Sequence, residues 1–217
     1  MKKIIVVLLM VILTPLITAC NQAREYVAKI DNTDTALLSI FTFDGKSESS
    51  FGLMNLGHSF LTIENISSEP IDICNKTIHS GETICVGTWS IRDHFGIWYN
   101  VESNYITEHN KYDGRVSVTI GIGSDDIDTI SDFIYKSDNW NPLHNCSYFA
   151  INLWNNIASN TEKLDIGGLF YTPAKLKSEI IKFPNYEINR EIITDTDFGY
   201  FNDTTYVSHT WYEEVAV

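Results

Sequence analysis

The chain has few basic residues. Lysine and arginine together number 15 against 28 aspartates and glutamates, so the formal net charge is −13. A chain this acidic lacks the positive surface that nucleic-acid binding requires, and anionic lipid headgroups would repel it. It also lacks internal repeats, low-complexity segments and a cluster of cysteine and histidine ligands, because the close pair His144 and Cys146 has no further ligand nearby. We therefore expect no nucleic-acid partner, no metal and no cofactor.

A long hydrophobic run is missing as well. The apolar run at residues 4–13 is too short to cross a bilayer, and it follows Lys2 and Lys3 and precedes small residues and Cys20. This order is typical of an export signal. Its end at Ala19 and Cys20 resembles the lipobox of bacterial lipoproteins, which implies cleavage before Cys20 and lipidation of its thiol. We expect a signal peptide at residues 1–19 and an extracytoplasmic protein whose only partner at the membrane is the bilayer that holds this lipid. The alternative is an ordinary secretory signal.

The remaining chain predicts one α+β domain. Residues 20–35 are polar and suit a tether, and residues 36–183 suit the domain. Residues 184–217 form a tail, which we expect to be either an edge strand or a loose wrap on the domain. Patterns typical of strands lie at 36–43, 57–64, 71–78, 83–89 and 115–122, and we expect the middle three of these to form a meander. Helices are expected after Ser124, Cys146 and Thr172, and residues 104–113 suit a loop.

The helix after Cys146 is the strongest pattern in the chain. Its apolar residues stand three, four, seven and eight places after Cys146, at Phe149, Ala150, Leu153 and Trp154. This spacing predicts one buried face, with Cys146 in the first turn and Asn145 as the N-cap. Unpaired backbone N–H groups and the helix dipole favour an anion there, so the thiol is a candidate nucleophile. The alternative is a small buried apolar side chain.

The other cysteines favour the same interpretation. Cys74 and Cys85 flank a segment that suits two strands around a turn at Ser80 and Gly81. Across such a hairpin the two would lie close enough for a disulfide. This leaves Cys146 as an odd thiol in an exported protein, which is a sign of reactivity. A disulfide from Cys146 to Cys74 or Cys85 would instead make it structural.

A cysteine nucleophile needs a base, and the chain has six histidines. His79 and His109 lie in predicted turns or loops, His209 lies in the tail, and His144 is too close to Cys146 in sequence to be expected to face it. His58 is the best candidate, since a strand holds it and the preceding Gly57 leaves space for a substrate. The alternative is a structural histidine.

Two short motifs together resemble a known family. Gly57-His58-Ser59-Phe60 on a strand, followed much later by Asn145-Cys146-Ser147-Tyr148-Phe149-Ala150 at a helix start, is similar to the circularly permuted papain-like arrangement of the NlpC/P60 superfamily. The Asn-Cys-x-x-Phe signature of its lecithin retinol acyltransferase-like branch matches Asn145, Cys146 and Phe149. Gly87-Thr88-Trp89 adds a similarity to secreted bacterial proteins of this type.

The resemblance implies a fold, a chemistry and residue roles. It implies an antiparallel sheet packed against the helix that carries Cys146, with Cys146 as nucleophile and His58 as general base. Asn75 is our expected third residue, with His94 and Asn65 as rivals; the retinol-acyltransferase pattern has histidine in this role. Residues expected to line the substrate site are Trp89, His94, Trp98 and Tyr99.

The implied function is hydrolysis of an amide in a peptide or in cell-wall peptidoglycan through an acyl-enzyme. An acyltransferase or lipid-ester hydrolase on the same site is the nearby alternative. A surface binding module that keeps the fold without catalysis is an alternative of a different class.

Overall fold

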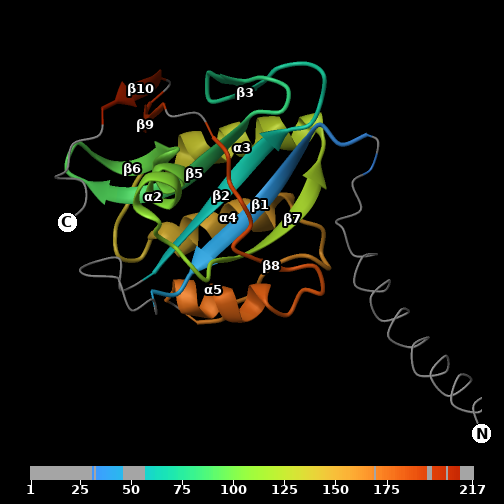
Figure 1. The fold of residues 1–217 in the computed structure, drawn as a ribbon, viewed down its shortest axis with the longest axis vertical. Coiled ribbons are helices and arrows are strands. Elements are labelled where there is room, and N and C mark those ends of the chain that lie inside the picture. The colour runs from blue at the N-terminus through green and yellow to red at the C-terminus, as the bar shows by residue number, and fades with distance from the viewer. Residues whose placement is uncertain are drawn as a thin grey trace, which may run out of the picture.

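A computed structural model of the chain describes residues 31, 33–45, 57–168, 170–194, 197–203 and 205–210. The predicted signal peptide and Cys20 therefore lie outside the described residues, as does most of the predicted tether. The main feature is an eight-stranded sheet in the order β10-β9-β6-β5-β2-β1-β7-β8, in which every pairing is antiparallel (Figure 1). None of the described helices is long and apolar enough to span a membrane.

The strands and helices have the following bounds. The sheet contains β1 (Ala36–Phe43), β2 (His58–Asn65), β5 (Thr83–Ile91), β6 (His94–Tyr99), β7 (Val116–Ile122), β8 (Glu187–Ile188), β9 (Phe198–Asn202) and β10 (Thr205–His209). A separate hairpin consists of β3 (Ile71–Ile73) and β4 (Lys76–Ile78). The described helices are α2 (Val101–His109), α3 (Ser124–Ser137), α4 (Cys146–Ile157) and α5 (Pro173–Ile180).

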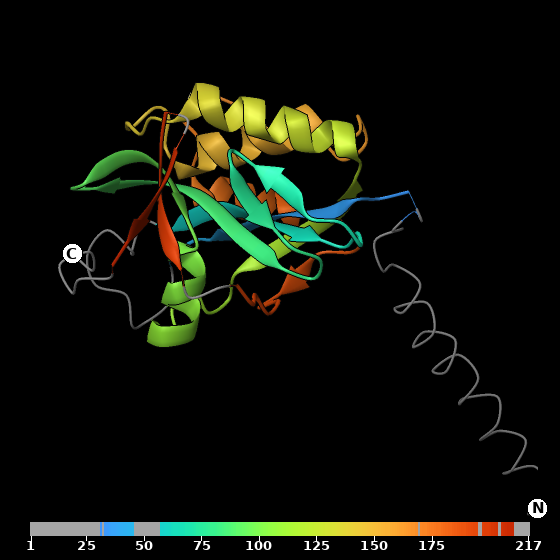
Figure 2. The ribbon, with the colours of Figure 1, turned by 90° about the horizontal axis from the view of Figure 1, so that it is seen from above.

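Helices cover both faces of the sheet. Figure 2 shows α3 and α4 on one face and α2 on the opposite face. Every residue of the central strand β1 is buried, so both of its faces are covered, since alternate side chains of a strand point to opposite faces. The larger core lies on the α4 face and includes Leu38, Leu61, Val86 and Trp154. The expected α+β class with an antiparallel sheet is confirmed.

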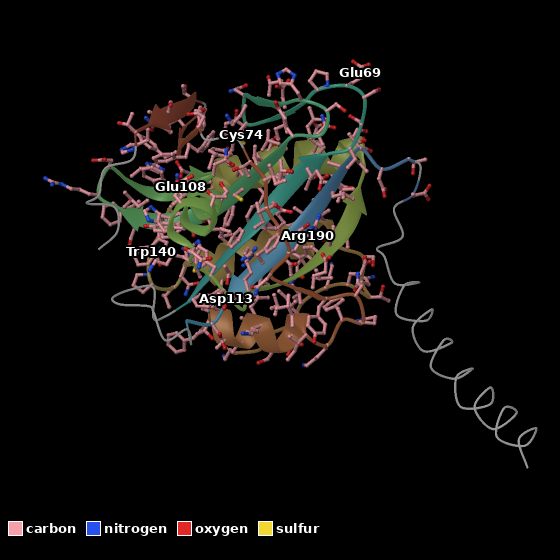
Figure 3. All side chains as sticks on the ribbon, viewed as in Figure 1. Glu69, Cys74, Glu108, Asp113, Trp140 and Arg190 are labelled. Carbon is pink, nitrogen blue, oxygen red and sulfur yellow. The ribbon has the colours of Figure 1, made fainter. Side chains whose placement is uncertain are left out.

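The face that carries α2 is also covered by the chain after α5. Arg190 donates to Ser39 on β1 at 2.8 Å and to Thr119 on β7, so this segment crosses the sheet. Figure 3 labels Arg190 near β1. Ile192 is buried against Phe41 and Phe60. The tail therefore closes a second core, and β9 and β10 extend the sheet at its edge.

Two of the three predicted helix caps agree with the structure. Asn145 has extended backbone and accepts a hydrogen bond from the Tyr148 N–H at 3.0 Å, as an N-cap does. Thr172 caps α5 in the same way, with Pro173 as the first helical residue. For α3 the cap is Gly123, one residue before the expected Ser124.

The predicted meander is wrong. Residues 71–78 form the two short strands β3 and β4, which pair with each other around a turn at Cys74 and Asn75. Both turn residues have positive φ, which favours a tight turn over a continuous strand. The neighbours of β5 are instead β2 and β6. A run of β-favouring residues does not reveal such a turn when it contains no glycine.

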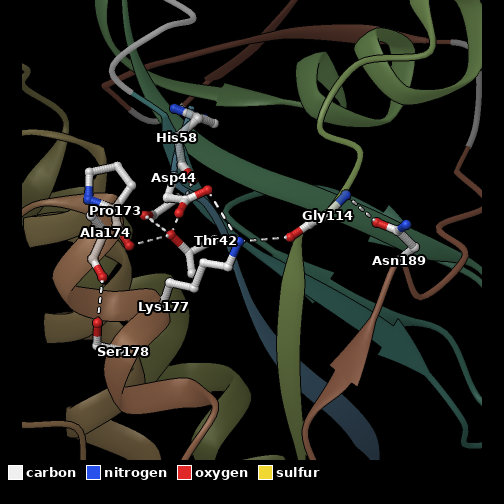
Figure 4. Close-up of polar contacts among 10 residues, drawn as sticks. Thr42, Asp44, His58, Gly114, Pro173, Ala174, Lys177, Ser178 and Asn189 are labelled. Atoms are coloured by element: carbon white, nitrogen blue, oxygen red, sulfur yellow. Dashed lines mark hydrogen bonds and ion pairs between the residues drawn. The ribbon is translucent and has the colours of Figure 1, made fainter. Parts of the chain in front are cut away.

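Buried hydroxyls join α4 and α5 to the end of the sheet where β1 stops and β2 begins. Ser59 on β2 lies 2.9 Å from the Ser147 hydroxyl on α4 and 3.0 Å from the Thr42 hydroxyl on β1. Thr42 also donates to the Pro173 carbonyl, and Figure 4 shows this contact beside His58. Lys177 links Asp44 to the Gly114 carbonyl. The residues around the start of β2 are thus held by several elements at once.

Candidate active site

Cys146 is the first residue of α4 and is half-buried. The helix buries Phe149, Ala150, Leu153 and Trp154 against the sheet, as their spacing predicts. This packing places the first turn of α4 next to the start of β2. There the thiol makes hydrogen bonds with the imidazole of His58 and with the backbone N–H of Ser59. The structure thus brings together the two residues that we expected to form a nucleophile and base.

His58 is the first residue of β2 and is 7% exposed. Its partner in the neighbouring strand is Phe43. The preceding Gly57 has φ +79°, and a Cβ on it would lie 2.2 Å from the Phe43 carbonyl oxygen. Gly57 is therefore needed for the close approach of β1, and the expectation that it leaves space for a substrate is wrong.

The second partner of His58 is Glu102, which sequence reasoning missed. Glu102 is the second residue of α2 and is fully buried. Its Oε1 lies 2.8 Å from His58 Nε2. Because Nε2 is engaged by the carboxylate, Nδ1 is the ring nitrogen available to the sulfur. The carboxylate orients the imidazole and favours its protonated form.

Two residues of β5 complete the surroundings of this carboxylate. Trp89 donates from Nε1 to Glu102 Oε1 at 2.7 Å, and its ring lies 4.2 Å from the His58 ring. A Cβ on Gly87 would lie 2.1 Å from Glu102 Oε1, so only glycine leaves space for the carboxylate in this position. The Gly-Thr-Trp motif thus supports Glu102, a role that could not be assigned while the acid was unknown.

The electrostatics favour a thiolate–imidazolium pair. Burial opposes a charge on His58, but the negative charge of Cys146 and hydrogen bonds to Cys146 and Glu102 outweigh burial and raise the pKa of His58 to about 9. Burial likewise opposes a charge on Cys146, but the charge and hydrogen bond of His58, with a hydrogen bond from the Ser59 N–H, lower the pKa of its thiol. Both effects favour the charged, nucleophilic sulfur at a lower pH than in an isolated thiol.

This arrangement is suited to attack on a carbonyl carbon. The sulfur is the nucleophile, His58 carries a proton for the leaving group, and Glu102 orients His58. The first N–H groups of α4 have no intrahelical acceptor, and they are donors for an oxyanion that forms beside Cys146. Within the described residues no group of three or more histidine, cysteine or acidic side chains is arranged to hold a metal ion.

Asn75 does not take the role that we expected for it. It lies in the β3–β4 turn and its side chain donates to the Tyr135 hydroxyl at 3.3 Å. The rival Asn65 is at the other end of β2, where it donates to the carbonyls of Glu69 and Ile78. The wrong meander caused this error, because it placed residues 74–77 opposite His58.

Of the residues expected to line the substrate site, only Trp89 contacts His58. Trp98 and Tyr99 are fully buried on opposite faces of β6, so they are core residues and that expectation is wrong. His94 lies at the start of β6, where its Nε2 is 2.8 Å from Asp138 Oδ1. The neutral aromatic pattern of β6 is as typical of a strand buried on both faces as it is of the wall of a substrate site.

The predicted disulfide between Cys74 and Cys85 is also absent, and both thiols are free. Cys74 belongs to the core on the α4 face, whereas Cys85 packs with Phe41 and Phe60 on the other face. Burial raises the pKa of Cys74 to about 11 and that of Cys85 well above its usual value. Cys146 is the one described cysteine whose thiol pKa is lowered.

The remaining histidines are distributed as follows. His79 and His109 are exposed, but His109 is the last residue of α2, so the loop expected at residues 104–113 is wrong for residues 104–109. His144 is exposed and packs on the Tyr148 ring at 4.7 Å. His209 on β10 has its Nε2 2.9 Å from Asp93.

A weak local signal explains why α2 and Glu102 were missed. The residue before α2, Asn100, has φ +60° and makes no side-chain cap, since its Oδ1 accepts from the Cys85 N–H instead. The only usable sign is the spacing of Val101 and Tyr105, which are four apart and both buried.

Comparison with known proteins adds nothing to these observations, since no family model, curated protein or solved structure matches the chain.

Proposed function

We propose that this chain is a thiol hydrolase of permuted papain-like type that cleaves an amide bond in a peptide or in cell-wall peptidoglycan. The observation that carries the proposal is the contact of Cys146 at the start of α4 with His58, which is itself oriented by Glu102. A strand that carries the histidine and a later helix that carries the cysteine fit the permuted order that the sequence motifs resemble.

The reaction follows from the charges in the resting site. The Cys146 thiolate attacks the carbonyl carbon, and the negative charge moves to the carbonyl oxygen, beside the first N–H groups of α4. When the carbon–nitrogen bond breaks, the His58 imidazolium gives its proton to the leaving amine. The acyl group remains on sulfur as a thioester. Neutral His58 then takes a proton from water as the water oxygen attacks the thioester carbonyl, the carbon–sulfur bond breaks, and the carboxylic acid leaves as the thiolate–imidazolium pair re-forms.

The test compares wild type with Cys146→Ala. Digestion of purified peptidoglycan, followed by mass analysis of the released fragments, should detect new amino and carboxyl ends with wild type only. Cys85→Ala is the matched control, since it removes a thiol outside the proposed site and should retain activity. Equal fragment release by wild type and Cys146→Ala would contradict the proposal, and a folded wild type that binds peptidoglycan without cleaving it would favour a binding module.

One observation favours the second candidate, an acyltransferase or lipid-ester hydrolase. The side chains of Leu143 and Phe170 are 59% and 64% exposed. They flank Asn145, whose Nδ2 donates to the Tyr171 carbonyl next to Phe170. Exposed apolar side chains on the two segments that lead to Asn145, the residue before the nucleophile, suit an acyl chain. Release of fatty acid from phospholipid vesicles, or its transfer to an added amine, would favour this candidate if peptidoglycan were untouched.

We also propose that a lipid on Cys20 anchors the protein outside the cytoplasm. The support is the lipobox-like end of the N-terminal segment. Labelled palmitate should enter the wild-type protein but not Cys20→Ser, and the wild type should fractionate with membranes. Incorporation of label into Cys20→Ser would contradict the anchor.

A further inference from the structure

Tyr112 carries a hydroxyl group that the fold leaves without a partner. The residue lies in the loop between α2 and β7 and is 3% exposed. Its hydroxyl is inaccessible to solvent and makes no hydrogen bond to any residue that the structure describes. Burying an unpaired hydroxyl destabilises a folded protein, and phenylalanine would avoid that cost at the same volume. The hydroxyl is thus unexplained by packing alone.

The backbone of Tyr112 carries a second cost. Its φ is +59°, in the left-handed region that side chains with a Cβ rarely adopt. Residues held in such conformations concentrate at functional sites, where the surrounding structure enforces them. The ring in turn packs against the base of the proposed catalytic pair, with its centre 5.9 Å from that of His58 and nearly parallel to it. Tyr112 therefore has both an unpaired buried hydroxyl and an unfavourable backbone conformation, and it lies beside the site.

A matching acceptor lies in the same site. Oε1 of Glu102 accepts from His58 and Trp89, but Oε2 is buried and has no hydrogen-bond partner within the described part of the chain. After burial, the charge of Glu102 is the largest influence on Tyr112, and it raises the pKa of that hydroxyl further above its usual value. The hydroxyl therefore keeps its proton at all physiological pH values and is a donor, as Oε2 requires.

We propose that Tyr112 is a positioning residue whose hydroxyl donates to Oε2 of Glu102 and holds the carboxylate against His58 during turnover. The two groups make no hydrogen bond in the described structure, so the bond forms when substrate binding moves the tyrosine ring or the carboxylate. A carboxylate fixed at both oxygens keeps the imidazolium in place, and the imidazolium stabilises the Cys146 thiolate. The inference rests on the Cys146, His58 and Glu102 arrangement of the proposed function, but on no particular substrate.

The first test is Tyr112→Phe, measured by the rate at which the substrate p-nitrophenyl acetate acylates Cys146 as a function of pH. A looser carboxylate weakens the imidazolium while substrate is bound, so acylation at pH 6.5 should slow by about fivefold, the loss of part of one charged hydrogen bond. Because the hydroxyl is unpaired in the free protein, the midpoint temperature of unfolding should stay the same or rise. Tyr99→Phe is the matched control, a buried tyrosine in the core of the α4 face, and it should leave acylation unchanged.

The second test asks whether Tyr112 acts through Glu102. In a Glu102→Gln background, Tyr112→Phe should slow acylation no further, because the carboxylate that it positions is gone. An unchanged profile for Tyr112→Phe, an equal slowing in both backgrounds, or a lowered unfolding temperature would each overturn the proposal. Failure of the hydrolase proposal would look different, since p-nitrophenyl acetate would still acylate wild-type Cys146 at pH 6.5 while no amide of peptidoglycan was cleaved.

Discussion

Three histidines of the described residues pair with a carboxylate, and the two shortest pairs have the same length, although only one of these two contacts a thiol. His58 Nε2 and Glu102 Oε1 are 2.8 Å apart, as are His94 Nε2 and Asp138 Oδ1. The first pair is buried and hydrogen-bonds Cys146. In the second, the same Asp138 oxygen also accepts from the Ile97 N–H at 2.8 Å, which ties the end of α3 to β6. The first pair suits catalysis and the second suits structure.

The distance between a histidine and a carboxylate therefore does not identify a catalytic histidine. Each carboxylate even approaches a glycine of the sheet, since a Cβ on Gly87 would meet Glu102 and a Cβ on Gly96 would meet Asp138. What differs is the third group. A thiol at the start of a helix gives the imidazolium a counter-ion that can also react, whereas a backbone N–H gives the carboxylate only an anchor.

The largest effect should come from the two histidines. His58→Ala removes the base and the counter-ion of Cys146, so acylation of the protein by p-nitrophenyl acetate at pH 7 should fall by about 10³-fold, in the range of a lost general base. His94→Ala should stay within about twofold of wild type. The burst of p-nitrophenol measures both variants. Equal losses in the two variants would mean that neither pair is specific to the thiol.

The carboxylates should show a smaller contrast. Glu102→Gln removes the negative charge that helps hold the pKa of His58 near 9. The imidazolium then loses its proton at lower pH and the thiolate needs higher pH to form, so the burst rate at pH 7 should fall by about 30-fold. Asp138→Asn should lower the unfolding temperature without this loss. A Glu102→Gln variant with wild-type rate would remove Glu102 from the site.

Substitution of Gly87 and Gly96 should also affect the two pairs differently. Gly87→Ala places a Cβ 2.1 Å from Glu102 Oε1, so the carboxylate must move and the burst rate should fall by about tenfold. Gly96→Ala places a Cβ 2.2 Å from Asp138 Oδ1, and its main result should be lower thermal stability. Thermal melts and burst rates on both variants check this. Retained activity in Gly87→Ala, with a normal melt, would contradict the tight fit around Glu102.

The smallest effect should come from Trp89→Phe. It removes one of the two donors to Glu102 Oε1 but keeps an aromatic ring near His58. The burst rate should fall by about threefold, since the carboxylate keeps its bond to His58. A loss as large as that of Glu102→Gln would assign Trp89 a larger part in the site than its hydrogen bond explains.

The part of the site that could be predicted from the sequence has local signals. The apolar face of α4 and the Asn145 cap place Cys146, and a strand start places His58. Their contact follows from the fold that the motifs resemble and not from their spacing, because 88 positions separate them. The α+β class could be predicted because strands and helices each have a clear period.

The rest could not be predicted because it depends on tertiary contacts. The helix that carries Glu102 begins at Val101, and the preceding Asn100 has left-handed backbone and makes no side-chain cap, so the usual sign of a helix start is missing. Aromatic residues of β6 suit a site wall or a core equally well, and only the cover by α2 and the tail decides for the core. Burial on both faces of a strand is a property of the neighbours rather than of the strand.

The proposed chemistry depends most directly on the ionisation of Cys146. Iodoacetamide alkylation of the folded protein between pH 4 and 10, resolved by mass mapping of each cysteine, measures it. Because the pKa of the Cys146 thiol is lowered and that of His58 is raised to about 9, Cys146 should be labelled readily at pH 6. Cys74 and Cys85, whose pKa values are raised by burial, should stay unlabelled. Labelling of Cys146 only above about pH 8.5, as for an ordinary thiol, would contradict the thiolate–imidazolium pair.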